Sequence, residues 1–194
     1  MSDTVVGPAD EAVWRDLQTV FSTRGDPAGC WCQWFKLPGP RFKELSVEQR
    51  RERLHDQTRA EAPGAAAPGV IAWVDDQPAG WAAVEPYSAY PNLARSPITK
   101  RVEGDPPDPW AVTCFVVRVD FRQRGVARSL LHGAVEHARA HGADVLEGYP
   151  VDPEVRPSLS NAERYHGTVS LFRDGGFEVV RRPSATRAIM RRTL

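Results

Sequence analysis

The sequence predicts a mixed α/β sandwich, in which a central sheet packs against helices. Short β-type runs recur from residues 4–6 to residues 185–194, and stretches with apolar residues at helical spacing separate several of them. A continuous apolar run at 110–117 is followed closely by an amphipathic stretch that starts at Val126. Because 194 residues, 41% of them apolar, suffice for one substantial core, we expect a single domain over 1–194.

The first half of the chain predicts three strands and two helices. Apolar residues from Val13 to Phe21 recur at the spacing of one helix face. Ser46, with Gln49 three residues later, forms a capping box at the start of a polar helix. In order, we expect a strand at 4–6, a helix over 10–21, an irregular stretch over 22–45, a helix over 46–61, a hairpin of strands 70–76 and 79–86, and a long loop or lid over 87–109.

The second half predicts a buried strand, a long helix and a C-terminal hairpin. The apolar run at 110–117 is typical of a strand buried on both faces, and the helix after it should stop at Gly142. Gly175 and Gly176 are expected to end a second helix. The remaining elements are a strand over 144–149, a helix over 163–174, and a hairpin of 177–182 with 185–194 around Pro183 and Ser184.

The charge and cysteine content exclude several classes of protein. The 25 Lys and Arg residues balance the 25 Asp and Glu residues, so no overall field attracts nucleic acid or an anionic membrane. No run of apolar residues is long enough to span a bilayer. Three cysteines, an odd number, argue against a disulfide framework and for a reducing compartment. We therefore expect a cytoplasmic protein, monomeric or homodimeric, that binds neither nucleic acid nor membranes.

The turn between the buried strand and the long helix has the features of a phosphate-binding loop. It consists of Arg122, Gln123, Arg124, Gly125, Val126 and Ala127. A helix N-terminus offers unpaired backbone N–H groups and a partial positive charge. Gly125 and Ala127 leave that backbone accessible, and Arg122, Arg124 and Arg128 add positive charge. The loop is neither a Walker A loop nor a dinucleotide fingerprint, because no Gly-Lys-Ser/Thr and no G-x-G-x-x-G is present.

This Arg-x-x-Gly-x-Ala turn resembles the acetyl-CoA pyrophosphate loop of the GNAT acetyltransferase superfamily. The segment SLFRDGGF (170–177) is similar to the superfamily's Leu-Tyr-x-x-x-Gly-Phe motif, and the order of elements matches over nearly the whole chain. The resemblance implies a GNAT-like fold, with a mostly antiparallel central sheet flanked by helices on both faces. It also implies an acyltransferase whose cosubstrate is acetyl-CoA.

The resemblance assigns acetyl-CoA to the strand and to the turn that follows it. Backbone groups of Phe115, Val116 and Val117 would hold the pantetheine arm and polarise the thioester carbonyl. The residues of the turn and of the first helical positions would bind the pyrophosphate, namely Arg122, Gln123, Arg124, Gly125, Val126, Ala127 and Arg128.

Direct attack of an amine on the thioester implies a proton acceptor and a proton donor. An alkylammonium has a pKa near about 10.4, so its proton must leave before the attack. The superfamily's usual general acid is the tyrosine of its Leu-Tyr motif, and Phe172 occupies that position here. A thiol is also a tolerable leaving group without an acid. The candidates for the two roles are Glu147, Tyr149 and Tyr165, with Glu85 and His166 as alternatives.

The hexapeptide CWCQWF (30–35) lies in the region that the resemblance assigns to the acceptor. Cys-x-Cys supplies at most two of the roughly four ligands that zinc needs, so we expect no metal site. Trp31, Trp34 and Phe35 have the spacing of one helix face and either pack into the core or contact the acceptor. Tyr87, in the proline-rich lid, is a further candidate for acceptor binding.

Three functions follow from this reading. The first is an acetyltransferase that acts on a primary amine of a small molecule. The second is an acetyltransferase for protein N-termini or lysines. The third is a CoA-binding module without catalysis, which the phenylalanine at position 172 favours.

Overall fold

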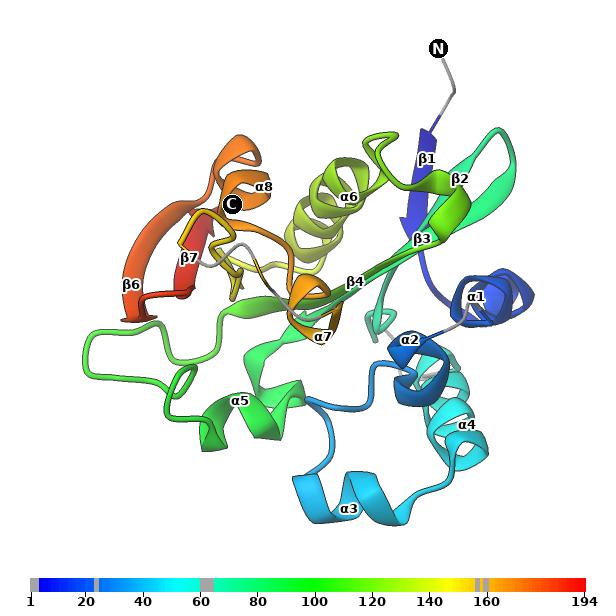
Figure 1. The fold of residues 1–194 in the computed structure, drawn as a ribbon, viewed down its shortest axis with the longest axis horizontal. Helices are drawn as coiled ribbons and strands as arrows, with labels where there is room; N and C mark the ends of the chain where they lie inside the picture. Colours follow the sequence, from blue (N-terminus) through cyan, green and yellow to red (C-terminus); the bar gives the residue numbers. More distant parts are fainter. Residues whose placement is uncertain (1–3, 23–24, 60–64, 156–157, 159–160) are drawn as a thin grey trace.

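The computed structural model describes residues 4–22, 25–59, 65–155, 158 and 161–194. One seven-stranded sheet runs through this part of the chain in the order β1-β2-β3-β4-β5-β7-β6 (Figure 1). The strands are β1 (Thr4–Pro8), β2 (Gly69–Val74), β3 (Gln77–Pro86), β4 (Trp110–Val117), β5 (Val145–Gly148), β6 (Glu178–Ser184) and β7 (Arg187–Thr193). All neighbouring strands are antiparallel except β4 and β5, so the predicted mostly antiparallel α/β fold is confirmed.

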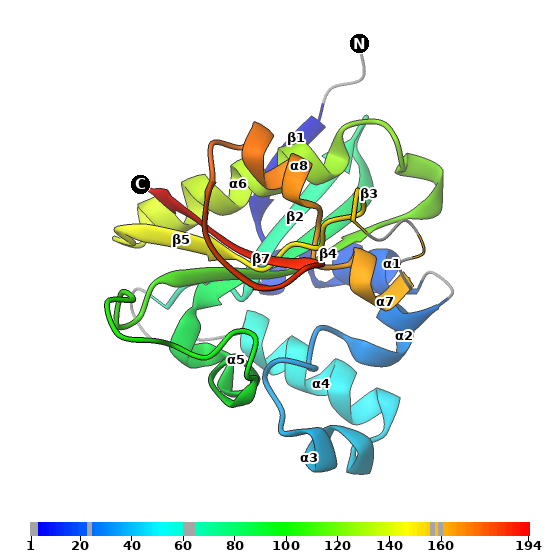
Figure 2. The ribbon, with the colours of Figure 1, turned by 60° about the vertical axis from the view of Figure 1, so that its left-hand side comes forward.

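Helices cover both faces of this sheet (Figure 2). One face carries α6 (Val126–Ala140) and α8 (Val169–Asp174). The other face carries α1 (Trp14–Phe21), α2 (Asp26–Cys30), α3 (Gly39–Glu44), α4 (Val47–Thr58) and α5 (Pro91–Arg95). The remaining elements are α7 (Asn161–Arg164) and the 3₁₀ turns η1 (Glu11–Val13), η2 (Tyr87–Ala89) and η3 (Val119–Phe121). The apolar face of α6 packs against β2, β3 and β4, as its spacing predicts.

Three stretches differ from the sequence-based expectations. Residues 22–45 and 87–109, expected to be irregular, contain the short helices α2, α3 and α5. Each of these begins with a proline in its first turn and spans at most six residues, too few to establish a period. The helix expected over 163–174 is split into α7 and α8 at Gly167, whose φ of 75° is not helical.

The β4 and β5 strands separate after three residue pairs. Trp110–Val112 pairs with Leu146–Gly148, whereas β4 continues to Val117. A bulge at Thr113 accompanies this separation, because Ala83 lies opposite Cys114 and Val84 opposite Val112. The segment between α7 and α8 lies along β4 at this point, where the N–H of Phe115 donates to the carbonyl of Tyr165 over 2.6 Å. The gap thus brings Tyr165 and His166 to the edge of β4.

The hexapeptide CWCQWF does not form the continuous helical turn that its aromatic spacing suggests. Trp31 and Cys32 have φ values of 49° and 52°, in the left-handed region, and α2 ends before them. Trp31 is therefore turned into the core, with its ring 4.9 Å from that of Phe21. Trp34 instead packs on Phe42 and is 47% exposed. The three aromatic residues do not share one face, because two left-handed residues interrupt the helix.

This arrangement predicts different effects for the two tryptophans. Trp31→Ala should lower the free energy of unfolding by about 3 to 4 kcal/mol, since it leaves a cavity beside Phe21. Trp34→Ala should lower it by less than about 1 kcal/mol, because nearly half of this side chain is already in water. Urea denaturation of both variants measures the difference. Equal losses of stability would contradict the placement of Trp31 in the core.

Candidate active site

The N-terminus of α6 forms one wall of a cavity of about 510 Å³. Gly125 precedes the helix with a φ of 82° and no side chain caps it. The first intrahelical bonds are those from the N–H groups of Arg128 and Ser129 to the Gly125 carbonyl, so the N–H groups of Val126 and Ala127 have no partner in the helix. Both residues line the cavity. The combination of free N–H groups and the helix dipole makes this cavity suitable for a phosphate group.

The three arginines of the loop are placed differently around this cavity. Arg122 and Arg128 line it, and Arg128 forms an exposed ion pair with Asp174 at 2.9 Å. Arg124 does not line it and lies beside the ring of Phe121. Gln123, with a φ of 62°, completes the turn and lines the cavity. Two of the three arginines are thus beside the unpaired N–H groups.

A second cavity, of about 460 Å³, adjoins the first and runs along the open edge of β4. Five residues line both cavities: Val117, Arg122, Ala127, Thr168 and Leu171. The N–H of Phe115 is bonded to Tyr165, and that of Arg118 to Ala79 on β3, so alternation along the strand directs the N–H of Val117 toward this cavity. The side chain of Val116 lies on the opposite face of the sheet.

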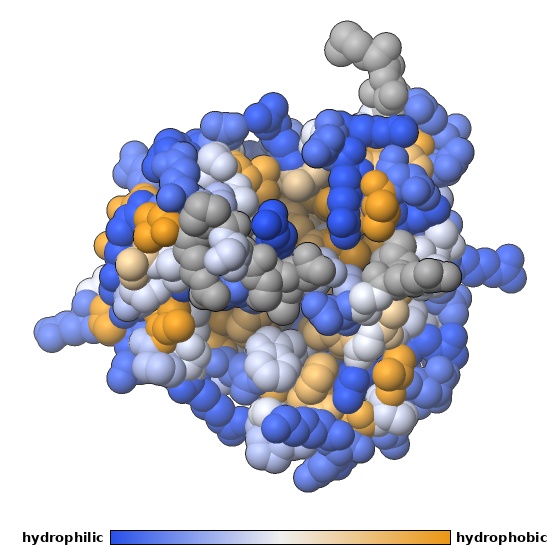
Figure 3. Space-filling model, viewed as in Figure 1, coloured by the Kyte–Doolittle hydropathy of each residue, from blue (hydrophilic) through white to orange (hydrophobic). Residues whose placement is uncertain are grey.

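A third pocket, of about 530 Å³, lies on that opposite face among α2, α3, α4 and β4. Its walls are mostly apolar and include Pro27, Trp34, Phe35, Phe42 and Val116. In the space-filling view, hydrophobic side chains line hollows near the middle of the visible surface (Figure 3). The pocket's volume and mostly apolar lining fall within the range typical of ligand pockets.

All three cysteines of the chain line this third pocket as free thiols. Burial raises the pKa of the Cys30 thiol to about 11. A hydrogen bond with Cys114, followed by burial, raises the pKa of Cys32, whose sulfur also accepts a bond of 3.1 Å from the indole N–H of Trp81. Cys30 and Cys32 are therefore neutral near pH 7, so they add apolar surface rather than charge.

Tyr165 is shared by the second cavity and the third pocket. Tyr165 is the first residue after α7. Its hydroxyl oxygen would lie 3.9 Å from a Cβ added to Gly25. Burial, followed by the charge of Asp26, raises the pKa of Tyr165, so the hydroxyl keeps its proton at neutral pH. Of the predicted catalytic residues, Tyr165 alone lies where the phosphate-side cavities meet the apolar pocket.

His166 faces the same pocket in its neutral form. Its Nδ1 lies 3.0 Å from the carbonyl of Thr113, which fixes the proton on that nitrogen and leaves Nε2 as an acceptor. Burial and the charge of Arg187 lower the pKa of His166 to about 4. Near pH 7 the imidazole carries no dissociable second proton, so His166 cannot serve as the general acid.

The lowered pKa of His166 predicts an acid-dependent loss of stability. Because the unfolded state takes up the proton near pH 6.5 and the folded state only near pH 4, the free energy of unfolding should fall as the pH drops through this window. The drop is at most about 3 kcal/mol, from 1.36 kcal/mol per pKa unit. Unfolding midpoints of wild type and His166→Gln between pH 4 and 7 measure it. Parallel curves for the two proteins would refute the assignment.

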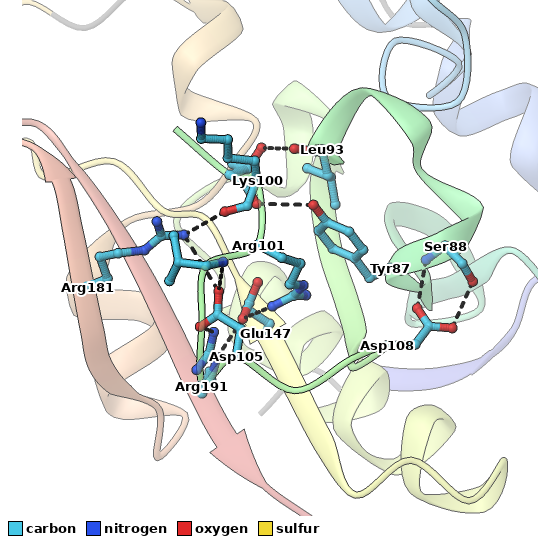
Figure 4. Close-up of polar contacts among 12 residues, drawn as sticks. Tyr87, Ser88, Leu93, Lys100, Arg101, Asp105, Asp108, Glu147, Arg181 and Arg191 are labelled. Atoms are coloured by element: carbon cyan, nitrogen blue, oxygen red, sulfur yellow. Dashed lines mark hydrogen bonds and ion pairs between the residues drawn. The ribbon is translucent and has the colours of Figure 1, made fainter. Parts of the chain in front are cut away.

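Glu147 belongs to an ion-pair cluster outside these three cavities (Figure 4). Its buried carboxylate accepts hydrogen bonds from Arg101 over 2.9 Å and from Arg191 over 2.6 Å. Arg191 also pairs with Asp105. The cluster therefore fastens the loop after α5 to β5 and β7. The sequence-based assignment of Glu147 as a catalytic base finds no support in this position.

Tyr149 and Tyr87 lie beside the same cluster. Both are buried, and neither lines any of the three cavities. The Tyr87 hydroxyl donates to the carbonyl of Thr99 over 3.2 Å, and Arg101 stacks on the Tyr87 ring. Burial raises the pKa of Tyr149 well above its usual value. These positions fit an anchored loop rather than contact with an acceptor or a cofactor.

Removing the charge of Glu147 should loosen this loop. Glu147→Gln leaves the guanidinium groups of two arginines facing each other without a counter-charge. We therefore expect the free energy of unfolding to fall by about 2 to 3 kcal/mol. This is less than for a fully buried ion pair, because both arginines keep some solvent contact. Hydrogen exchange in the 96–109 segment should accelerate as well. Unchanged stability and exchange would show that the cluster does not hold the loop.

Glu85 and Phe172 also lie outside the three cavities. Glu85 is paired with Lys36, and burial raises the pKa of its carboxyl group. Phe172 is fully buried, edge-to-face with Phe115 and Phe177. The position that resembles the superfamily's tyrosine is thus part of the core.

Sequence reasoning did not identify Asp26, Phe42 and Arg50 as pocket residues. The guanidinium of Arg50 donates to the carbonyls of Gly29, Phe42 and Leu45, which joins α2, α3 and α4 around the pocket. No local pattern marks these residues, since they lie in short helices without periodicity. The proline after Asp26, typical of a first helical turn, was the one usable signal.

Comparison with known proteins identifies the family. The model of the acetyltransferase (GNAT) family matches residues 30–167, more than half of the chain. The chain therefore belongs to this family and is an acyltransferase. No match was found among curated proteins.

Several solved structures share the fold at low sequence identity. The GNAT domain of S. lividans PAT is 17% identical, with a TM-score of 0.56 over 100% of this chain and 97% of that chain. An acetyltransferase structure from Salmonella typhimurium with its cofactor acetyl-CoA is 14% identical, with a TM-score of 0.53 over 98% and 94%. A ribosomal-protein-alanine N-acetyltransferase from Brucella melitensis is 18% identical, with a TM-score of 0.52 over 98% and 99%.

The described residues contain no group of three or more His, Cys, Asp or Glu side chains that could hold a metal ion. No helix in this part of the chain is long and apolar enough to cross a membrane.

Proposed function

We propose that this acetyltransferase transfers the acetyl group of acetyl-CoA to a primary amine of a small molecule. The observation that carries the proposal is the position of Tyr165, which lines both the cavity along β4 and the apolar pocket. A pantetheine arm that runs from the α6 N-terminus along β4 would bring its thioester to this junction. An acceptor in the apolar pocket would meet it there.

The proposed reaction is direct attack of the neutral amine on the thioester carbonyl carbon. The new C–N bond forms, the oxygen takes negative charge, and the backbone N–H of Val117 is the donor best directed to receive it. Collapse of the intermediate breaks the C–S bond and restores the carbonyl. The Tyr165 hydroxyl gives its proton to the departing thiolate and recovers one as the amide nitrogen loses its extra proton.

The lining of the apolar pocket favours a small-molecule acceptor over a peptide. The pocket is lined by side chains of three helices, one strand and the segments 32–35 and 165–166, and its apolar walls offer few backbone groups with which an extended peptide could pair. A protein N-terminus or lysine remains the alternative acceptor. Location in the cytoplasm, supported by the three free thiols, and a monomeric or homodimeric state are part of the same proposal.

Acetyl-CoA turnover with a panel of acceptors tests this function. Primary amines of small molecules and peptides with free N-termini or lysines are compared by release of CoA thiol and by mass spectrometry of the product. Reactions without acceptor correct for the three cysteines of the protein. We expect acetylated small amines. Turnover confined to peptides would establish the protein-acceptor alternative, and tight CoA binding without any turnover would leave a CoA-binding module.

A further inference from the structure

The apolar pocket has a simple charge pattern. Among the described residues that line it, Asp26 and Arg50 carry a formal charge near pH 7. His166 is neutral there, because burial lowers its pKa to about 4. The rest of the lining is aromatic, aliphatic or thiol surface, to which Tyr165 adds a hydroxyl group.

Arg50 is not free to bind an anionic acceptor. Its Nη1 donates to the carbonyl of Gly29 over 2.6 Å, and its Nη2 to those of Phe42 and Leu45 over 2.8 and 2.7 Å. Its Nε also donates to the Phe42 carbonyl, and its Cζ lies 4.1 Å from the Phe42 ring centroid. A carboxylate or phosphate on the acceptor would have to displace these bonds, which hold the pocket walls together.

Asp26, unlike Arg50, is available to bind a charged group of the acceptor. Its carboxylate makes no hydrogen bond or ion pair within the described part of the chain, and it is exposed at the start of α2. The preceding Gly25 lies beside the Tyr165 hydroxyl, where an added Cβ would be 3.9 Å from the oxygen. An unpaired negative charge therefore stands next to the point where the acetyl group would arrive.

The aromatic wall supplies the second feature. Trp34 packs edge-to-face on Phe42, with ring centroids 5.2 Å apart, and keeps 47% of its surface exposed. Phe35 meets the ring of His166 edge-to-face at 5.4 Å. Exposed indole surface inside a concave pocket is the arrangement that receives another ring.

We infer that the acceptor is an aryl-alkyl primary amine, whose ring lies against Trp34, Phe35 and Phe42 and whose ammonium group pairs with Asp26. This inference rests on the proposed function and narrows it to one substrate class. Asp26 would bind and orient the ammonium beside Tyr165 before it loses its proton to water. The same carboxylate would repel acceptors that carry a negative charge next to the amine.

Binding to the CoA-loaded protein tests the inference without any turnover. The probes are 2-phenylethylamine, phenylalanine, which adds a carboxylate next to the amine, and propylamine, which lacks the ring. Titration calorimetry should give 2-phenylethylamine the lowest Kd, by at least ten-fold over each of the other two. Equal or tighter binding of phenylalanine or propylamine by the wild-type protein would overturn the inference, whatever the variants do.

Three variants test which residues bind 2-phenylethylamine. Asp26→Asn should raise the Kd of 2-phenylethylamine at least ten-fold, and Trp34→Ala about five-fold or more. CoA affinity should be unchanged in both, and Tm should fall by no more than the few degrees that a loss below about 1 kcal/mol gives. Glu52→Gln, an exposed carboxylate on α4 outside the pocket, is the matched control and should change nothing. An Asp26→Asn variant that folds, binds CoA and keeps wild-type affinity for 2-phenylethylamine would remove Asp26 from the proposal.

Turnover separates this inference from the proposed function. Selective binding of 2-phenylethylamine through Asp26 without acetylation would retain the site and refute the acetyltransferase proposal. Acetylation of other small amines, with no preference for the aryl-alkyl class, would retain the proposed function and refute the substrate class.

Discussion

Replacement of Gly125 by glutamate is expected to abolish CoA binding, with a rise in Kd of at least about 100-fold, or roughly 3 kcal/mol. Gly125 holds a φ of 82°, which a side chain strains, and it directly precedes the unpaired N–H groups of Val126 and Ala127. A carboxylate here would occupy the helix N-terminus and repel the pyrophosphate. Titration calorimetry with CoA measures the change.

Two further substitutions separate charge from backbone strain. Gly142 follows the other end of the same helix with a φ of 76°, and, like Gly125, it has no atom near an added Cβ. Gly142→Glu should therefore cost similar strain and leave the Kd of CoA unchanged. Gly125→Ala, which adds strain without charge, should weaken binding by less than ten-fold. Full affinity in Gly125→Glu would refute the phosphate site at α6.

Replacement of Tyr165 by phenylalanine is expected to lower kcat by about 10²- to 10³-fold, the usual contribution of a general acid. The ring is retained, so the pocket wall and the KM of the acceptor should change little. The effect should be largest at neutral pH, because burial raises the pKa of Tyr165 and keeps the wild-type hydroxyl protonated there. Steady-state kinetics with a saturating amine measure kcat.

The matched control is Tyr149→Phe, which removes a buried hydroxyl outside the three cavities. This variant should keep wild-type kcat. A loss of kcat in Tyr149→Phe together with normal turnover in Tyr165→Phe would reverse the assignment. Normal turnover in both would mean that the thiolate leaves without a protein acid, as the low pKa of thiols permits.

The phosphate-side half of the site was predictable because its determinants are local. A buried strand, a turn with Gly125 and an amphipathic helix follow one another within about thirty residues, and the structure places them as their patterns predict. The capping box at Ser46 is local in the same way and is present. Such local signals can be interpreted from the sequence without knowledge of the tertiary structure.

The acceptor half could not be predicted in the same way because it depends on contacts between distant segments. The left-handed backbone at Trp31 and Cys32 separates side chains that the helical spacing would have grouped. Glu147 lies on β5 and Tyr149 directly follows that strand, but Arg101 from the loop after α5 pairs with the Glu147 carboxylate. Tyr165 reaches the junction of the β4 cavity and the apolar pocket because the helical conformation is interrupted at Gly167. No period in the sequence marks this interruption.

The central claim is that the thioester of acetyl-CoA meets the acceptor beside Tyr165. A crystal structure of the protein with CoA tests it most directly. We expect the pyrophosphate at the N–H groups of Val126 and Ala127, the pantetheine arm along β4 past Val117, and the thiol within hydrogen-bonding distance of the Tyr165 hydroxyl. A pantetheine arm that ends away from Tyr165, or that does not open into the pocket lined by Trp34 and Asp26, would contradict the account.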